Sequence, residues 1–281
     1  MKKSFFIFGL LFTVSLATVV FNSCSKDDEI RLPLSTLTLA VGEEFIVHAF
    51  FSGPNITIIT WTSSNESVAT VVDGKITAIS AGTVVITAKA GNETAVCAVI
   101  VYDPFYDEGI VINGIKWATR NVAAPGTFAA MPESSGMFYQ RNRKIGWSTT
   151  DPMINSNGDT VWNRSGNDYI FAWEKSNDPS PIGWRVPTGV EVQSLLDTDK
   201  VTSVWTTENG IRGRRFTDRT SGNSLFLPAV GYRCMDGMLY HAGSWSIYRC
   251  CRSQWDLGLG SFSYTGASVG AFGLSVRSVA E

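Results

Sequence analysis

Cysteine and histidine are the side chains of this sequence best suited to bind a metal or form a covalent bond. Cys234, His241, Cys250 and Cys251 lie close together near the C-terminal end. They make a Cys₃His set, but their spacing is not that of a zinc finger, and adjacent cysteines rarely both ligate one ion. We therefore expect no metal and no cofactor. In an exported protein, a disulfide from Cys234 to Cys250 or Cys251 is the favoured interpretation.

Short motifs of common enzyme sites are absent from the sequence. It has no Gly-x-Ser-x-Gly, no phosphate loop and no HExxH. Calcium-dependent lectins use a Trp-Asn-Asp motif, and Trp162-Asn163-Arg164 lacks the acid. We predict a protein that is not an enzyme. A glycan-active enzyme stays open as an alternative, because catalytic carboxylates cannot be paired from one sequence.

The segment from Trp245 to Phe272 has the composition of a binding surface. Arg, Tyr, Trp, Ser and Gly are mixed there without a helix or strand period, and such residues dominate binding hot spots and adaptable loops. We expect a surface glycan or a protein ligand to be contacted by Trp245, Tyr248, Arg249, Arg252, Trp255 and Tyr264. The alternative is an ordinary succession of loops and strands whose aromatic side chains belong to the core.

The N-terminal residues have the pattern of an export signal. Two lysines after Met1 precede an uncharged, mostly apolar run from Ser4 to Val20, the pattern of a secretory signal peptide. A transmembrane anchor is the alternative, although the run is short for a span of about 20 residues. The formal net charge is -2, without a basic block, so we expect no nucleic-acid partner.

The residues that follow resemble two sorting signals of Bacteroidota lipoproteins. Phe21-Asn22-Ser23-Cys24 resembles their relaxed lipobox, although Phe21 and Asn22 depart from the strict form. The resemblance implies cleavage after residue 23, lipidation of Cys24 and a tether over residues 24–31. Ser25-Lys26-Asp27-Asp28-Glu29 resembles a surface-export signal, which implies attachment to the outer membrane with the protein facing outward.

Residues 32–102 predict an all-β sandwich. Short β-branched runs alternate with turns at a spacing of about 8–12 residues, and Asp73-Gly74 between two such runs indicates a hairpin. Residues 61–88, WTSSNESVATVVDGKITAISAGTVVITA, closely resemble bacterial Ig-like domains of group 2. The resemblance implies a small Ig-like sandwich that acts as a spacer. We expect Cys97 to be a buried thiol in its last strand.

Residues 103–281 predict a second domain of mixed structure. Asn113-Gly114 indicates a hairpin, and residues 123–177 have the composition of long packed loops. A capping box from Thr188 to Glu191 predicts one helix, with apolar residues at Val192, Leu195 and Leu196. Strands are expected over 224–232 and 272–279.

Four motifs in this segment carry a further resemblance. GIKWA at 114–118, GWRVPT at 183–188, FLPAVGYR at 226–233 and GLSVR at 273–277 together resemble the Fibrobacter succinogenes major paralogous domain. The resemblance implies an α+β, C-type-lectin-like domain whose first and last strands pair. The resemblance also implies a disulfide between two cysteines at the positions where this chain has Ser180 and Ser278, so both partners of that bridge are replaced together.

These observations together predict a cell-surface lipoprotein that displays a C-type-lectin-like adhesion head on an Ig-like spacer. Variable proteins of diversity-generating retroelements use the same lectin fold, and Arg249-Cys250-Cys251-Arg252 replaces the usual Trp-Ser-Ser run. Diversification of the C-terminal segment is therefore part of the hypothesis. A structural or assembly subunit of a surface or pilus complex is an alternative to the binding protein.

Overall fold

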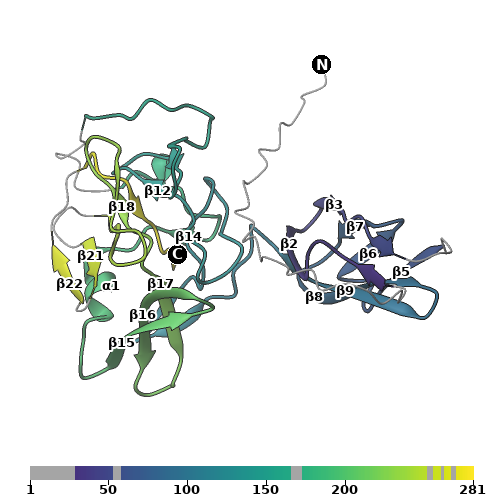
Figure 1. Cartoon of the computed structure of the whole chain (residues 1–281). Coiled ribbons are helices and arrows are strands. Elements are labelled where there is room, and N and C mark those ends of the chain that lie inside the picture. Colours follow the sequence, from purple (N-terminus) through teal and green to yellow (C-terminus); the bar gives the residue numbers. More distant parts are fainter. Residues whose placement is uncertain (1–28, 53–57, 166–172, 252–255, 261–262, 267–269) are drawn as a thin grey trace.

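The computed structural model describes residues 29–52, 58–165, 173–251, 256–260, 263–266 and 270–281 (Figure 1). Strand pairing joins β1–β9 among themselves and β10–β24 among themselves. The buried hydrophobic clusters divide in the same way among the described residues. Within the same residues, no helix is both long enough and apolar enough to span a bilayer.

The first domain is a β-sandwich. One sheet has the order β2-β9-β8-β5, another has the order β3-β7-β6, and β1 pairs with β4. The strands are β1 (Glu29–Arg31), β2 (Thr36–Ala40), β3 (Glu44–Ile46), β4 (Phe50–Ser52), β5 (Ile59–Ser63), β6 (Ala69–Val72), β7 (Lys75–Ala78), β8 (Gly82–Ala90) and β9 (Glu93–Tyr102).

Alternation of side chains builds the core of this sandwich. Val84 and Ile86 of β8 and Cys97 of β9 are buried and pack in one cluster with Ile76 of the facing sheet, because every second residue of a strand points to the same face. The predicted hairpin at Asp73-Gly74 is confirmed, with both residues at positive φ between β6 and β7. Cys97 is the predicted buried thiol.

The second domain is built mostly of short strands. Its sheets have the orders β10-β11-β24-β14, β13-β12-β23-β20-β21-β22, β15-β16-β17 and β18-β19. The strands are β10 (Ile110–Ile112), β11 (Ile115–Trp117), β12 (Phe138–Tyr139), β13 (Gly146–Trp147), β14 (Trp184–Arg185), β15 (Val201–Glu208), β16 (Ile211–Asp218), β17 (Ser224–Pro228), β18 (Tyr232–Arg233), β19 (Leu239–Tyr240), β20 (Ser246–Tyr248), β21 (Asp256–Leu259), β22 (Ser263–Gly266), β23 (Leu274–Ser275) and β24 (Val279–Ala280).

Helix is scarce in this domain, so the expected α+β class is corrected to a β-rich one. The predicted helix exists as α1 (Gly189–Ser194), six residues long, and a 3-10 turn, η1, covers Lys175–Asn177. The capping box is confirmed. The Thr188 side chain accepts a hydrogen bond from the backbone N–H of Glu191, and the Glu191 side chain accepts one from the backbone N–H of Thr188. The helix ends at Ser194, and the chain then turns at Asp197, whose backbone oxygen accepts hydrogen bonds from the N–H groups of Lys200 and Val201.

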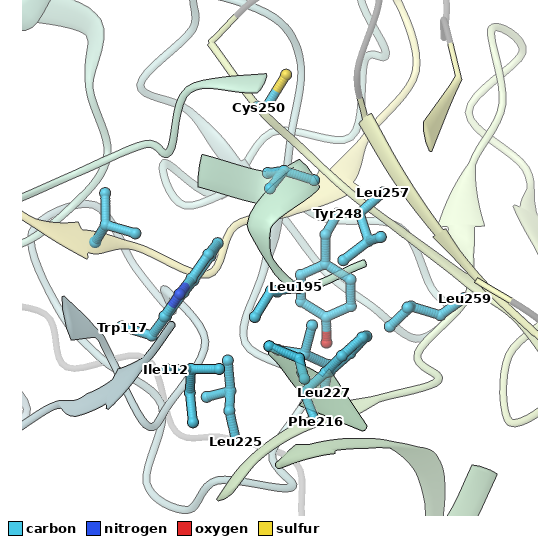
Figure 2. Close-up of a cluster of buried hydrophobic side chains, with 13 residues drawn as sticks. Ile112, Trp117, Leu195, Phe216, Leu225, Leu227, Tyr248, Cys250, Leu257 and Leu259 are labelled. Atoms are coloured by element: carbon cyan, nitrogen blue, oxygen red, sulfur yellow. The ribbon is translucent and has the colours of Figure 1, made fainter. Parts of the chain in front are cut away.

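The core of the second domain lies where helix, hairpin and sheets meet (Figure 2). Trp117 of β11, Leu195 after α1, Phe216 of β16, Tyr248 of β20 and Leu257 of β21 are all at most 2% exposed. The first hairpin and the last strand share one sheet, since Trp117 pairs with Val279. This pairing of the domain's two ends is the one expected from the sequence.

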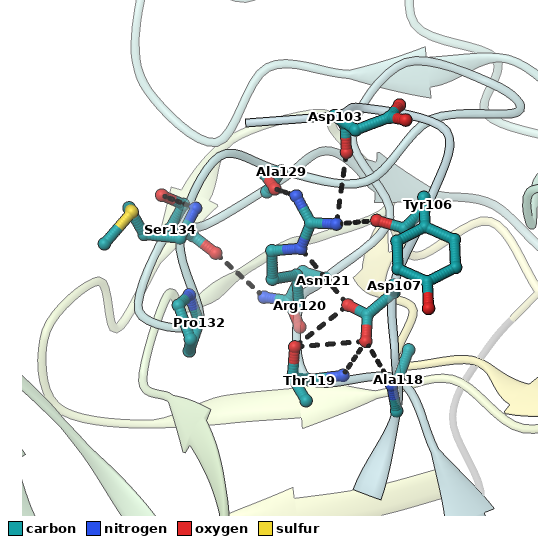
Figure 3. Close-up of polar contacts among 12 residues, drawn as sticks. Asp103, Tyr106, Asp107, Ala118, Thr119, Arg120, Asn121, Ala129, Pro132 and Ser134 are labelled. Atoms are coloured by element: carbon teal, nitrogen blue, oxygen red, sulfur yellow. Dashed lines mark hydrogen bonds and ion pairs between the residues drawn. The ribbon is translucent and has the colours of Figure 1, made fainter. Parts of the chain in front are cut away.

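Buried arginines hold the irregular loops in place. Arg120 donates to Asp107 and to the backbone oxygens of Asp103, Tyr106 and Ala129 (Figure 3). A guanidinium carries five donors in a fixed plane, so one side chain can satisfy several loop carbonyls that have no strand partner. Arg120 thereby fixes the segment directly after β9 to the second domain.

Candidate functional site

The structure divides the six residues predicted to bind a ligand. Trp245 is half-buried, whereas Tyr248 and Arg249 are 2% and 0% exposed. Tyr264 of β22 pairs through its backbone with Gly258 of β21. Arg252 and Trp255 lie outside the described residues, as does the predicted lipidation site Cys24.

Tyr248 belongs to the core. Its hydroxyl donates to the Pro228 backbone oxygen at 2.9 Å and accepts from the Asn121 amide at 3.3 Å. Burial raises the pKa of this phenol to about 12, because ionisation would place a charge away from water. The expectation that Tyr248 contacts a ligand at the surface is therefore wrong: its side chain is enclosed and its hydroxyl is used inside the domain.

Arg249 is likewise enclosed, and its contacts hold the backbone of a residue of the aromatic cluster described below. Its guanidinium lies 3.1 Å from the Asp256 carboxylate and donates at 2.6 Å to the backbone oxygen of Phe272. Asp256 also accepts from the Cys250 backbone at 2.8 Å. Burial lowers the pKa of Arg249 to about 10. Arg249 is thus corrected from a ligand contact to a residue that holds the chain at Phe272.

An aromatic cluster lies beside these buried residues and includes one predicted site residue, Trp245. Tyr232 is at its centre, and its ring centroid lies 5.7–6.0 Å from the centroids of Tyr240, His241, Trp245 and Phe272. The cluster is open to solvent on one side, since Tyr240 is 40% exposed and His241 is exposed too. We call these five residues the aromatic platform.

One glycine and one buried arginine position the platform. Gly231 has φ +80°, and a Cβ at this position would overlap the backbone oxygen of Tyr240, so only glycine lets β18 approach the end of β19 this closely. Arg233, 1% exposed, donates to the backbone oxygens of Ser148 and Gly237 and pairs with Asp151 at 3.1 Å. The hairpin that carries Tyr232 and Tyr240 is thereby tied to a neighbouring loop.

Sequence reasoning missed most of this platform. Tyr232 stands in the quoted FLPAVGYR motif but reads there as one more strand residue. Tyr240 and His241 follow the Asp236-Gly237 turn, and Met238, two residues before Tyr240, is 61% exposed. An apolar residue at every second position after a tight turn, with no buried partner expected, was the signal that could have indicated an exposed aromatic face.

The expected disulfide is not present. Cys234, Cys250 and Cys251 are thiols in this structure. Cys250 is wholly buried in the core of Figure 2, while Cys251 packs against a different cluster containing Val186. Neighbouring residues of an extended chain point to opposite sides, which separates the two thiols from one another.

Other clefts offer less chemistry. A cavity of about 710 Å³ is lined by Trp173, Arg185, Cys251 and the C-terminal Glu281 among others, and its charges are largely paired, Arg185 with Glu191 at 2.5 Å and Lys175 with Glu281. No group of three or more His, Cys, Asp or Glu side chains suited to a metal occurs within the described ranges.

Comparisons with known proteins leave the family open. No family model and no curated protein matches the sequence. Among solved structures, the S-layer protein rSbsC(31-844) aligns with a TM-score of 0.26 and 13% identity over 70% of this chain and 24% of its own. Domains 5-6 of the S-layer protein SbsC align with a TM-score of 0.24 and 11% identity over 88% and 94%. The chain thus spans about a quarter of the first of these proteins, and scores this low carry no argument about its fold or function.

Proposed function

We propose that this chain is an exported, cell-surface lipoprotein whose second domain binds a surface glycan or a protein ligand through the aromatic platform. The exposed stack of Tyr240 and His241 on Tyr232, next to Trp245, carries this proposal. Tyr and Trp supply large contact areas at a low cost in side-chain entropy, and they dominate binding hot spots.

The geometry of the platform suits binding because it is fixed before a ligand arrives. Tyr232 contacts four rings, Arg233 ties its strand to a loop, and Arg249 holds the backbone of Phe272. A preorganised surface loses less conformational freedom on association than a mobile one. Exposed Met235 and Met238 extend the apolar surface next to it, and methionine adapts to irregular partners.

Two observations support a C-type-lectin-like assignment of the second domain. Its first hairpin and last strand pair, as that fold requires. The hydroxyl groups of Ser180 and Ser278, at the two positions where the resemblance implies cysteines, lie 2.7 Å apart. In this proposal the first domain is an Ig-like spacer, and the lipid at Cys24 attaches the chain to the outer membrane.

Binding is tested with the full chain in detergent micelles, applied to an array of bacterial and host glycans and to intact host cells. Tyr240→Ala and Trp245→Ala should each weaken binding at least about tenfold, as expected of hot-spot residues. Ile182→Ala is the matched control, because Ile182 is fully exposed outside the platform. Equal binding by all three variants would remove the platform from the proposal.

Anchoring is tested separately in living cells. Incorporation of radiolabelled palmitate should depend on Cys24, so that Cys24→Ala is unlabelled and is released from the membrane fraction. A labelled Cys24→Ala chain would contradict the lipid assignment while leaving the binding site unaffected.

A further inference from the structure

Strand β15 is an open edge of the second domain. It is eight residues long and stands at one end of the sheet β15-β16-β17, on the side away from β17 (Figure 1). Over the described part of the chain it pairs with β16 alone. An edge strand presents a row of backbone groups that can pair with another chain.

The turn after β15 determines which backbone groups face outward. Asn209 and Gly210 join the two strands with φ of +46° and +82°, as in the two-residue hairpin turn with positive φ at both positions. Glu208 and Ile211 therefore close the hairpin as a hydrogen-bonded pair. Because such pairs alternate in an antiparallel ladder, the N–H and C=O groups of Ser203, Trp205 and Thr207 point away from β16.

The side chains of β15 do little to block this edge. Natural edge strands are commonly protected by lysine, proline, a bulge or brevity. β15 has the sequence VTSVWTTE, without lysine or proline, and it pairs with β16 in an unbroken register of eight residue pairs. Val204, at its centre, is 55% exposed. An unprotected edge of this length is more readily explained as an interface than as a free surface.

We propose that β15 pairs antiparallel with β15 of a second copy, about a two-fold axis at Val204. In this register Ser203 of each copy exchanges backbone hydrogen bonds with Trp205 of the other, which satisfies outward groups on both strands. Lys200, just before β15, then lies opposite Glu208 of the other copy. Glu208 holds Arg215 with one carboxylate oxygen at 2.9 Å, and its second oxygen can accept from Lys200.

The charge match favours this partner and this register. A shift of the axis by one residue, to Trp205, places Lys200 opposite Gly210 and Glu208 opposite Thr202, so both ion pairs are lost. An isologous pairing uses the same surface on both copies and closes on itself, so it gives a dimer and not a fibre. The inference is independent of the proposed ligand and of the aromatic platform.

A cysteine at the axis tests both the contact and its register. Val204 would face its counterpart in a non-hydrogen-bonded pair, where the Cα atoms lie about 4.5 Å apart, within the range that a disulfide spans. The full-length chain carrying Val204→Cys should form a disulfide-linked dimer under mild oxidation in its native membranes. Val190 lies on α1 and is 77% exposed, so Val190→Cys is the control and should form far less disulfide-linked dimer. Equal dimer yields from the two variants would overturn the proposal.

A proline at position 203 should prevent β15 from pairing with a second copy while the domain keeps its fold. Ser203→Pro deletes one outward N–H group and leaves the bonds from β15 to β16 intact, which is the position where edge strands tolerate proline. Ser203→Ala is the matched control, since it loses the same hydroxyl bond to Arg214 but keeps the N–H group. The dimer yield of Val204→Cys should fall severalfold with Ser203→Pro and persist with Ser203→Ala; unchanged yields with both would refute strand pairing.

Discussion

The hydroxyl oxygens of Ser180 and Ser278 lie 2.7 Å apart, although 98 positions separate the two residues in the sequence. Ser278 lies between β23 and β24, and Ser180 precedes β14, which pairs with β24. The pairing of these two strands brings the serines together. The sequence resemblance suggested that relatives carry a disulfide here, and the spacing of the hydroxyls fits such a pair.

A disulfide should therefore form when both serines are replaced. The double variant Ser180→Cys/Ser278→Cys closes a loop of about 100 residues, for which the chain-entropy model gives about 3–5 kcal/mol. We expect a higher unfolding temperature that falls back on reduction, and peptide mapping should find residues 180 and 278 in one cross-linked fragment. The single variants are the controls, and a double variant that remains a dithiol under oxidising conditions would contradict the geometry.

The sequence predicted well those elements whose signals are local. Asp73-Gly74 and Asn113-Gly114 specify hairpins because few residues other than glycine, asparagine and aspartate accept positive φ, and the Thr188 capping box marks the start of α1. It predicted the binding segment poorly. Arg249 has the residue type of a hot spot, yet it is wholly buried because Asp256, seven residues later, neutralises it. Such a pairing depends on how β20 and β21 meet, which no local pattern records.

Replacing Tyr248 by phenylalanine should affect stability and not binding. The variant keeps the ring in the core but leaves the Pro228 oxygen and the Asn121 amide without the hydroxyl. Loss of these hydrogen bonds should cost about 1–3 kcal/mol, measurable as a lower urea midpoint. Ligand binding at the platform should remain, and a stable variant that no longer binds would return Tyr248 to the site.

The Tyr248→Phe variant also isolates the part of the protein's stability that depends on pH through this phenol. The pKa of Tyr248 is raised by burial to about 12, whereas the phenol of an unfolded chain titrates near about 10. Folding therefore favours the neutral form of the phenol. The contribution of Tyr248 to the free energy of unfolding is fully present below pH about 10 and is lost as the pH rises toward about 12. The stability gap between wild type and Tyr248→Phe should narrow across this window, and a constant gap in urea unfolding would contradict the assigned burial.

Arg120→Ala should strongly destabilise the second domain. Arg120 is 9% exposed, and its removal leaves the buried Asp107 carboxylate without its cation and three backbone oxygens without a donor (Figure 3). Breaking a buried ion pair on one side costs about 3–5 kcal/mol. Arg215→Ala is the comparison, because its pair with Glu208 is substantially exposed and should contribute about 1 kcal/mol or less. Calorimetry that finds equal losses for both would contradict the role given to Arg120.

Gly231→Ala should disturb the aromatic platform beyond the ordinary effect of an alanine at positive φ. Gly231 and Gly222 have φ of +80° and +75°, but a Cβ at Gly231 meets the Tyr240 backbone, whereas nothing lies within 4 Å of one at Gly222. Both variants should lose about 1 kcal/mol from the strained backbone. Only Gly231→Ala should also displace Tyr240 from Tyr232, seen as an altered near-ultraviolet circular dichroism spectrum and weaker ligand binding. Because the two substitutions share their backbone cost, identical spectra and affinities would show that the close approach of β18 to β19 does not hold the platform together.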